Sequence, residues 1–526
     1  MHKTLAIALI VYLFTGFYSS AQTPTWADDV ASIIYTNCTK CHNSNGIGPM
    51  PFESYQNAVD FSSNIKVAVM TKRMPPWPPD ENYSQFAHER LLTPEQIQTI
   101  QEWVDGGTPQ GNMANAPALP TFGAYELSDY DLELGIPHYT VNTATDLYRC
   151  FVIPVNNATA RYIKDIEVIP GDRSVVHHVL VYQDPTNTPA NLDAAQAGPG
   201  YTSFGGTGSS ASKLISGWVP GGTAFRFPYQ MGPKLDANTN IILQIHYPGG
   251  TFNTVDSTKI RIKFHSASLV REVLIDPAIN HFFLDNGPLF IPANTTKWFY
   301  AQYTIPSQYN VSVLNVAPHM HLIGKKIKVW GETPTGDTIP VIKIDDWDFH
   351  WQGFYAFKNL LKVPGGTVVK AEAFYDNTSA NHDNPNSPPQ NVSAGESTTD
   401  EMMLVYFTYT LYFPGDENIS QETEPSNPTS LEQSDLSMYI KSIQVYDVYP
   451  NPAFDYLNVA MAIPNPTTLH YSIIDISGRT MWTDIEDLNG GMANKQIQIS
   501  HLANGNYILK VEANNKMVTK QFIVQK

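Results

Sequence analysis

Cysteine is scarce in this sequence. Only three of its 526 residues are cysteines, namely Cys38, Cys41 and Cys150. Three are too few for a disulfide scaffold, so each needs its own explanation.

Charged residues are also few, and most of them are acidic. Charged residues make up 15%, and 49 acidic against 32 basic residues give a net charge of −17. Because no basic run is present, the sequence excludes nucleic acid and anionic membrane surfaces as partners.

A membrane-spanning apolar run is absent too. The stretch Leu5–Tyr18 is apolar but shorter than a bilayer requires, and it lies between Lys3 and the small residues Ser19-Ser20-Ala21. This arrangement is typical of a signal peptide, which we expect over residues 1–21. The mature protein is therefore expected to pass through the periplasm to the cell surface or the medium, without a transmembrane anchor.

Proline (39 residues) and glycine (33) are plentiful, which suits short strands joined by turns. Apolar and polar residues alternate in strand-length runs separated by Pro-Gly-Gly turns. We therefore expect a multidomain, mainly β chain with two β-sandwich domains of the jelly-roll kind. The expected boundaries are 131–272 and 273–413 for these domains, 442–526 for an Ig-like β-sandwich, and 113–130 and 414–441 for two solvated linkers, the second one acidic.

Residues 22–112 are expected to form a small helical domain. Its last helix is marked by Thr93 as N-cap, Pro94 at the first helical position and Gln96 completing a capping box. An earlier helix, expected over Ala27–Tyr35, leads into a CxxCH sequence described next.

The sequence Cys38-Thr-Lys-Cys41-His42 has the spacing of a c-type haem attachment site. Two thiols at this spacing can form thioethers with the haem vinyl groups, and the histidine that follows can bind the iron. The alternative is a CxxC disulfide or redox pair beside an incidental histidine. The helical setting and the low cysteine content favour one covalently bound haem c.

The sixth iron ligand is expected to be a methionine from a later segment, Met70 or Met74. Met74 precedes Pro75-Pro76, which hold an extended segment that could present the thioether rigidly. The stretches Arg73–Trp77 and Trp103–Gly107 resemble a small class of cytochrome c-like domains, and that resemblance implies Met74. From the residues alone, Met70 remains an alternative.

Histidines gather in three places within the β region. His177-His178 lies in an expected strand, Val175–Tyr182, His246 ends another strand, and His319-Met320-His321 follows a third. The two-residue period of a strand puts both imidazoles of an HxH on one face as a chelating pair. Adjacent His177 and His178 would point oppositely, so both reach one metal only through a bulge or through different ring nitrogens.

A methionine thioether, which is a soft metal ligand, is available in Asp400-Glu401-Met402-Met403. Strand parity places Met402 on the same face as Leu404 and Tyr406, opposite a face that starts at Met403, so one face can line a site while the other is core. A thioether with two imidazoles suits copper that cycles between Cu(I) and Cu(II).

Five motifs in order resemble the copper type II, ascorbate-dependent monooxygenases, which include peptidylglycine α-hydroxylase and dopamine β-monooxygenase. They are VVHHVLV at 175–181, GWVP at 217–220, LQIHY at 243–247, PHMHLIG at 318–324 and DEM at 400–402. The resemblance covers roughly Asp131–Phe413. It implies two β-sandwich domains, each with one copper ion, separated by a solvent-filled cleft.

The resemblance also implies roles for individual residues. The ligands of an electron-transfer copper would be His177, His178 and His246. The copper that meets O₂ and hydroxylates a C–H bond would be bound by His319, His321 and Met402, with Gln244 and Tyr406 close to the active site.

Two positions depart from the peptide-amidating members of that family. Ala317 stands where those members have an arginine that binds the substrate carboxylate, and Leu404 stands where they have an amide. A peptidylglycine substrate is therefore not expected. Cys150 has no partner beyond the haem pair and is expected to be a buried core thiol.

The C-terminal segment resembles a type IX secretion sorting domain. The resemblance rests on Val448–Pro452, Ile473–Arg479, Leu502–Ile508 and the basic end Lys516–Lys526, and it implies the type IX machinery as a partner. The alternative is a β-sandwich accessory module, for example one that binds carbohydrate.

These features together predict an exported haem–copper monooxygenase that acts on a small organic substrate with O₂. Its expected cofactors are two copper ions and one haem c, and its electrons would come through the haem from an external donor, from ascorbate, or from both. The alternatives are a non-catalytic copper and haem protein for electron transfer or metal binding at the surface, and an adhesin whose metal sites are vestigial.

Overall fold

The computed structural model describes residues 23–526, except 45, 47, 122–125, 229, 267–269, 423–442, 450, 464–465, 489–490 and 514–515. The expected signal peptide and most of the expected acidic linker lie outside the described residues. Within those residues, no helix is both long and apolar enough to span a bilayer. The chain divides into two compact units, one of residues 1–75 and 91–122 and one of residues 76–90 and 123–526.

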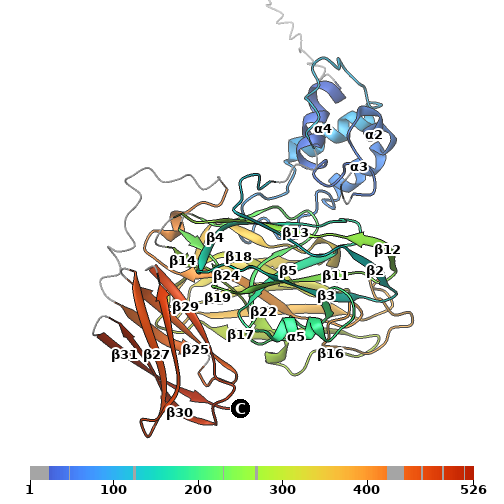
Figure 1. Cartoon of the computed structure of the whole chain (residues 1–526). Helices are drawn as coiled ribbons and strands as arrows, with labels where there is room; N and C mark the ends of the chain where they lie inside the picture. The colour runs from blue at the N-terminus through green and yellow to red at the C-terminus, as the bar shows by residue number, and fades with distance from the viewer. Residues whose placement is uncertain are drawn as a thin grey trace, which may run out of the picture. The chain divides into compact units, whose positions relative to one another are not determined.

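The first unit is helical, as expected. Its elements are η1 (Trp26–Val30), α1 (Ala31–Asn37), α2 (Tyr55–Asp60), α3 (Ser62–Met70) and α4 (Pro94–Asp105) (Figure 1). The predicted capping box is confirmed, because Thr93 Oγ1 accepts the Gln96 N–H at 3.2 Å and Gln96 Oε1 accepts the Thr93 N–H at 2.9 Å. Trp26, Ile100 and Trp103 are fully buried in the shared core of these helices.

The second unit contains three β domains, which confirms a multidomain, mainly β chain. The first β domain has two sheets around one core. One sheet contains β1 (Leu132–Gly135), β13 (Lys259–Phe264), β4 (Arg161–Ile169), β10 (Lys234–Leu235) and β8 (Phe225–Arg226). The other runs β6 (Tyr201–Thr202), β3 (Leu147–Pro154), β11 (Asn240–Tyr247), β5 (His178–Asp184), β7 (Lys213–Trp218). Alternate residues of both sheets, such as Ile166 and Leu243, meet in the core.

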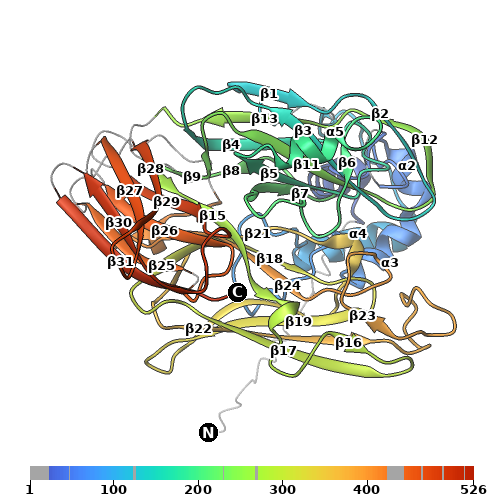
Figure 2. The ribbon, with the colours of Figure 1, turned by 60° about the horizontal axis from the view of Figure 1, so that its bottom comes forward.

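The second β domain is built in the same way. One sheet runs β15 (Leu274–Asn280), β24 (Leu404–Leu411), β18 (Val311–His319), β21 (Tyr355–Val363). The other runs β17 (Thr296–Thr304), β22 (Val368–Asp376), β19 (Gly324–Glu332), β20 (Thr338–Ile344) (Figure 2). Val405 and Val329, one from each sheet, lie in its core.

The third β domain comprises the C-terminal strands. One sheet runs β25 (Gln444–Tyr449), β26 (Tyr456–Ile463), β29 (Gly491–Gln498), and the other β28 (Thr480–Leu488), β27 (Thr467–Asp475), β30 (Gly505–Ala513), β31 (Lys516–Val524). Both sheets contribute to one buried cluster that includes Leu457 and Ile473.

Residues 76–90 fall inside the range expected for the helical domain, but they pack with the second β domain. Phe86 is buried in that domain's core, and Trp77 packs edge-on against Tyr355 with ring centroids 5.4 Å apart. Backbone hydrogen bonds run from Asp80 N to Lys343 O at 2.8 Å and from Ala87 N to Ala356 O at 2.7 Å. This segment, called the strap below, is therefore part of the second β domain although both its ends continue into the helical unit.

Asp416, in the expected acidic linker, is buried rather than solvated, although most of residues 414–422 are exposed. Asp416, in the short helix η4 (Asp416–Asn418), receives both ends of the Arg271 guanidinium at 2.7 and 2.9 Å and the Ser312 hydroxyl at 2.6 Å. Both ion-pair partners are buried. The expectation of a solvated connector from residue 414 is thus corrected at Asp416, because a buried guanidinium needs a buried carboxylate.

Candidate metal centres

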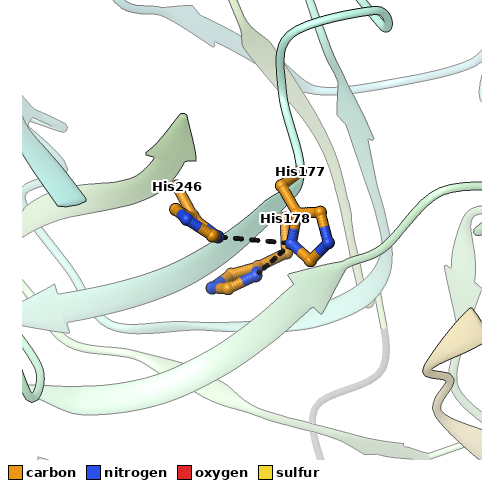
Figure 3. A group of neighbouring side chains, drawn as sticks. All are labelled: His177, His178 and His246. Carbon is orange, nitrogen blue, oxygen red and sulfur yellow. Dashed lines mark hydrogen bonds between the residues drawn. The ribbon is translucent and has the colours of Figure 1, made fainter. Parts of the chain in front are cut away.

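Three histidines converge in the first β domain (Figure 3). His178 on β5 and His246 on β11 face each other in the strand register, and the backbone N–H of His177 donates to the carbonyl of His246 at 2.9 Å. The Nδ1 atom of His177 lies 3.2 Å from Nδ1 of His178 and 3.2 Å from Nδ1 of His246. The three residues predicted to form one site are therefore together.

The expected strand over Val175–Tyr182 is wrong at its start. A turn closes from Asp172 to Val175, whose N–H donates to the carbonyl of Asp172 at 3.3 Å, and β5 begins only at His178. Because His177 precedes the strand, its side chain is free of the strand alternation. The two adjacent imidazoles can therefore point to one place without a bulge.

The spacing of these nitrogens fits a metal ion. Two imidazole nitrogens that each bind a metal at about 2.0 Å lie about 3.3 Å apart at a tetrahedral angle, close to the 3.2 Å between the Nδ1 atoms. Burial lowers the pKa of His177 to about 3 and that of His178 well below its usual value. Both rings are therefore neutral at physiological pH and have a lone pair for a metal.

Asp146 and Tyr148 support this site from β3 and the turn before it. Asp146 Oδ1 lies 3.3 Å from Nε2 of His246, and the Tyr148 ring stacks on His246 with centroids 4.3 Å apart and planes 2° from parallel. The same carboxylate accepts the N–H of Thr398 at 3.1 Å and its hydroxyl at 2.5 Å. A carboxylate on the far nitrogen of a ligating histidine fixes its ring. Burial raises the pKa of Asp146, but the bonds from His246 and Thr398 outweigh it and lower the pKa overall.

His319 and His321 form a second cluster in the second β domain. His319 ends β18, His321 lies beyond it, and their ring centroids are 5.1 Å apart. Nδ1 of His319 hydrogen-bonds Gln352 Oε1, and Nδ1 of His321 lies 3.1 Å from the carbonyl oxygen of Asp400. Because both Nδ1 atoms are engaged, Nε2 of each ring is the atom that could bind a metal. Met320 lies in the core of the second β domain, although His321 is beyond the strand whose alternation was expected to place it.

Burial also keeps these rings neutral. It lowers the pKa of His319 to about 4 and that of His321 to about 3. Neutral imidazoles need not release a proton when a metal binds.

The carboxylate of Glu401 ties the second cluster to Met402. Glu401 is completely buried, and its two oxygens accept the backbone N–H groups of His321 at 2.9 Å, Ile323 at 2.9 Å, Gly324 at 3.2 Å and Met402 at 3.1 Å. Burial raises the pKa of Glu401 to about 8, and the four N–H donors oppose that rise. One side chain thus fixes the turn that carries His321 and the backbone that carries Met402.

The strand parity predicted around Met402 is confirmed on its core side. Met403, Val405 and Phe407 lie in the core of the second β domain. In the strand register Leu404 is opposite His319 and Tyr406 is opposite Ala317, so these four side chains share the other face. Met402, 5% exposed, precedes β24, and the Tyr375 hydroxyl donates to its carbonyl at 2.8 Å.

Gln244 lies on β11 two residues before His246, but its amide is committed to the backbone. Its Nε2 donates to the carbonyl oxygens of Ser203 at 3.2 Å and Gly206 at 2.7 Å, and the side chain is buried. Its support for the site is therefore through the loop 203–206. Opposite it in the register, Cys150 is fully buried and outside any disulfide, which confirms the expected core thiol.

An aromatic ring lies between the two histidine clusters, where the family resemblance led us to expect solvent. Phe349, in the short helix η3 (Phe349–Trp351), stacks on His177 with centroids 5.0 Å apart and meets His321 edge-on at 5.8 Å. The ring is only 9% exposed. The expectation of a solvent-filled cleft is thus corrected at this point, because an apolar side chain fills the space.

In the helical unit, the CxxCH residues form a turn that follows α1. The backbone N–H groups of Cys41 and His42 both donate to the carbonyl of Cys38, at 3.2 and 2.9 Å. Nδ1 of His42 lies 2.9 Å from the carbonyl oxygen of Met50, and its ring stacks on Phe52. A ligating histidine usually donates its second N–H to such a carbonyl, so Nε2 of His42 is the atom available to a haem iron.

The two candidate sixth ligands differ in their surroundings. Met70, at the end of α3, is 48% exposed. Met74 is partly buried, and its N–H donates to the carbonyl of Ala68 at 3.1 Å. The fixed backbone and partial burial favour Met74, while both remain candidates.

Comparisons with known proteins identify three parts of the chain. Residues 132–251 match the family described as "Copper type II ascorbate-dependent monooxygenase, N-terminal domain", and residues 287–430 match its C-terminal domain. Residues 447–525 match "Secretion system C-terminal sorting domain", so the protein is exported to the cell surface or the extracellular space. None of these ranges includes the helical unit.

Individual relatives of the chain are also described as monooxygenases. The chain is 23% identical over 397 residues to human "DBH-like monooxygenase protein 1", covering 72% of this chain and 59% of the relative. It is 24% identical over 357 residues to the mouse protein of the same name, covering 64% and 54%. The chain thus spans just over half the length of these curated relatives. A Faecalibacterium prausnitzii β-glucuronidase structure aligns at a TM-score of 0.13 and 13% identity, over 45% of this chain and 38% of that one, a likeness too low to carry an argument.

The contacts of Glu401 give a direct test of the second cluster. Replacing Glu401 with Gln keeps the shape but puts an NH₂ group against backbone N–H donors. We expect copper affinity at this cluster to fall by about 10- to 100-fold, the usual cost of losing such support, while the three-histidine cluster keeps its copper. Copper titration followed by electron paramagnetic resonance measures both.

Glu396→Gln is the matched control, since this glutamate lies in the same loop but is not among the groups that hold His321 or Met402. We expect it to leave both affinities unchanged. Equal copper binding by Glu401→Gln and the native protein would contradict the role given to Glu401.

Proposed function

The chain belongs to the copper type II ascorbate-dependent monooxygenase family, and on that premise we propose that it hydroxylates a C–H bond of a small organic substrate with O₂. The observation that carries the proposal is the pair of unlike donor sets in adjacent β domains. One consists of three imidazoles whose nitrogens converge. The other would consist of the His319 and His321 imidazoles and the Met402 thioether, and Glu401 joins the backbone segments that carry His321 and Met402. A storage protein needs no such difference between its sites.

Each donor set suits one part of the reaction. His177, His178 and His246 would hold one copper ion, and His319, His321 and Met402 the other. Copper would supply one-electron redox chemistry at the first set and, with the softer thioether ligand, O₂ activation at the second. The chain's own task is to keep these imidazoles neutral, orient them through Asp146, Gln352 and Asp400, and exclude water around them.

The face that would meet substrate begins at His319 and continues through Ala317, Leu404 and Tyr406. None of the three residues beyond His319 carries a charge that could bind a carboxylate. This supports a substrate that is not recognised through a C-terminal carboxylate, unlike a peptidylglycine. Tyr406, whose pKa burial raises to about 12, stays protonated and can donate a hydrogen bond to the substrate.

The helical unit is the electron source in this proposal. The CxxCH turn would hold one covalent haem c through Cys38 and Cys41, with His42 on one side of the iron and Met74 on the other. Trp77 follows Met74 by three positions, so their Cα atoms are within about 11 Å of each other however the units lie. Trp77 belongs to the strap that packs on Tyr355. The helical unit, as a one-electron carrier, is thus joined covalently to both ends of the strap, which is part of the second β domain. Ascorbate is the alternative reductant.

Met402→Leu tests the second donor set. Leucine has nearly the volume of methionine and suits the strand face, so the fold should persist, but the thioether is lost. We expect bound copper to fall from two ions to one per chain and hydroxylation to be abolished, as measured by elemental analysis and product formation. The adjacent core residue supplies the control, because Met403→Leu should keep both copper ions and activity. Full activity in Met402→Leu would show that the ligand assignment is wrong.

Cys38→Ala/Cys41→Ala tests the haem supply. Without thioethers the haem is not retained, so we expect the haem absorption bands to disappear and turnover with the native electron donor to be lost. Turnover with ascorbate should continue, since ascorbate can reduce copper without the haem. If the double variant turned over unchanged with the native donor, the helical unit would not be the electron source.

A further inference from the structure

The turn between β20 and β21 touches ligands of both donor sets. Its Phe349 ring stacks on His177 of the first set and meets His321 of the second edge-on. Three residues later, Gln352 hydrogen-bonds Nδ1 of His319 through Oε1, and its Nε2 donates to the carbonyl of Phe349 at 2.9 Å.

Neighbouring residues hold this turn firmly. Trp347 is buried in the core of the second β domain, and its N–H donates to the carbonyl of Lys325 at 2.9 Å. Asp348 caps η3 by accepting the N–H of His350 at 2.9 Å. On the other side, Phe354 packs edge-on against Phe225 of the first β domain, with centroids 5.4 Å apart. Trp347 and Asp348 therefore hold the backbone beside Phe349 on the second β domain, and Phe354 adds a contact with the first.

The proposed reaction requires electron transfer between the two donor sets, and the Phe349 ring lies between a ligand of each. Hydroxylation with O₂ requires two electrons, each copper stores one, and so the electron held at the first set must reach the second. Electron transfer through protein weakens steeply with distance and with gaps between atoms. A buried ring in contact with one ligand of each set keeps the gaps between atoms on this path small.

The other connection between the sets is longer. It leads from His246 across 3.3 Å to Asp146, through a hydrogen bond to Thr398, and along the backbone to Asp400, whose carbonyl contacts His321. That route has three non-covalent steps and several residues of backbone, whereas the route through Phe349 has two ring contacts and no backbone.

We infer that Phe349 is the bridge through which the electron passes from the three-histidine site to the His₂Met site, an inference that rests on the proposed function. His177, His178 and His246 would hold the copper ion that gives up one electron, and His319, His321 and Met402 would hold the copper ion that stores the other. The Phe349 ring would connect the ligands His177 and His321. Without substrate, the two electrons, one from each copper ion, would reduce O₂ to H₂O₂ with two protons from water.

Substitution of the ring tests the bridge without knowledge of the substrate. Native protein and Phe349→Leu, each loaded with copper and reduced without excess reductant, are mixed with O₂ and freeze-quenched, and electron paramagnetic resonance counts Cu(II) over time. We expect the native protein to oxidise both coppers in one phase. Phe349→Leu should bind two copper ions but oxidise them in two phases, with half of the Cu(II) in the slower one.

Two further variants complete the experiment. Phe354→Leu removes a ring from the same turn without touching a histidine and should behave as the native protein does. Phe349→Tyr keeps the ring and should restore the single phase.

A single phase in Phe349→Leu, or loss of copper from it, would overturn the bridge, since the ring would then be dispensable or merely structural. Failure of the native protein itself to bind two copper ions, or to form Cu(II) with O₂, would instead contradict the proposed function.

Discussion

The carboxylate of Glu401 accepts four backbone N–H groups in a fully buried position, and the geometry of the second metal site depends on it. Strand β18 can deliver only His319, because the strand ends there, and β24 starts two residues after Met402. The turn that carries His321 and the segment that carries Met402 are therefore irregular backbone, whose polar groups must be satisfied by other means. The Glu401 carboxylate accepts hydrogen bonds from the N–H groups of both segments, so the backbone positions of His321 and Met402 depend on the same side chain.

The two β domains are coupled at their metal sites by contacts of different kinds. Asp146 lies 3.3 Å from Nε2 of His246 of the first site and accepts hydrogen bonds from Thr398 in the loop before Met402. Phe349 joins His177 to His321 through an apolar ring. A change in the distance between the domains would have to break both contacts. The strap makes a different connection, because it inserts Phe86 into the second β domain while its ends continue into the helical unit.

Local sequence pattern was sufficient for the capping box at Thr93 and for the core side of the strand at Met403, and both are confirmed. The family resemblance, rather than local pattern, implied that the three first-site histidines converge, and their nitrogens lie within 4.8 Å of one another. What the sequence could not provide depends on contacts between distant segments. Asp146, Glu401 and Phe349 show no spacing signal, because their partners come from other strands. The start of β5 was misplaced because Val175 and Val176 look like strand residues, whereas both donate to the Asp172 carbonyl in a turn and the strand starts only at His178. The strap was assigned to the helical domain by its position in the chain, although its Trp77 and Phe86 pack elsewhere.

Two unlike copper sites and one haem in a single exported chain form the central claim. Elemental analysis of iron and copper in the purified, exported protein tests it most directly, because it depends on neither substrate nor electron donor. The account predicts two copper ions and one iron per chain, with the copper reduced to one by Met402→Leu. Iron without copper would contradict it, since the protein would then be a cytochrome joined to β domains whose histidines bind no metal.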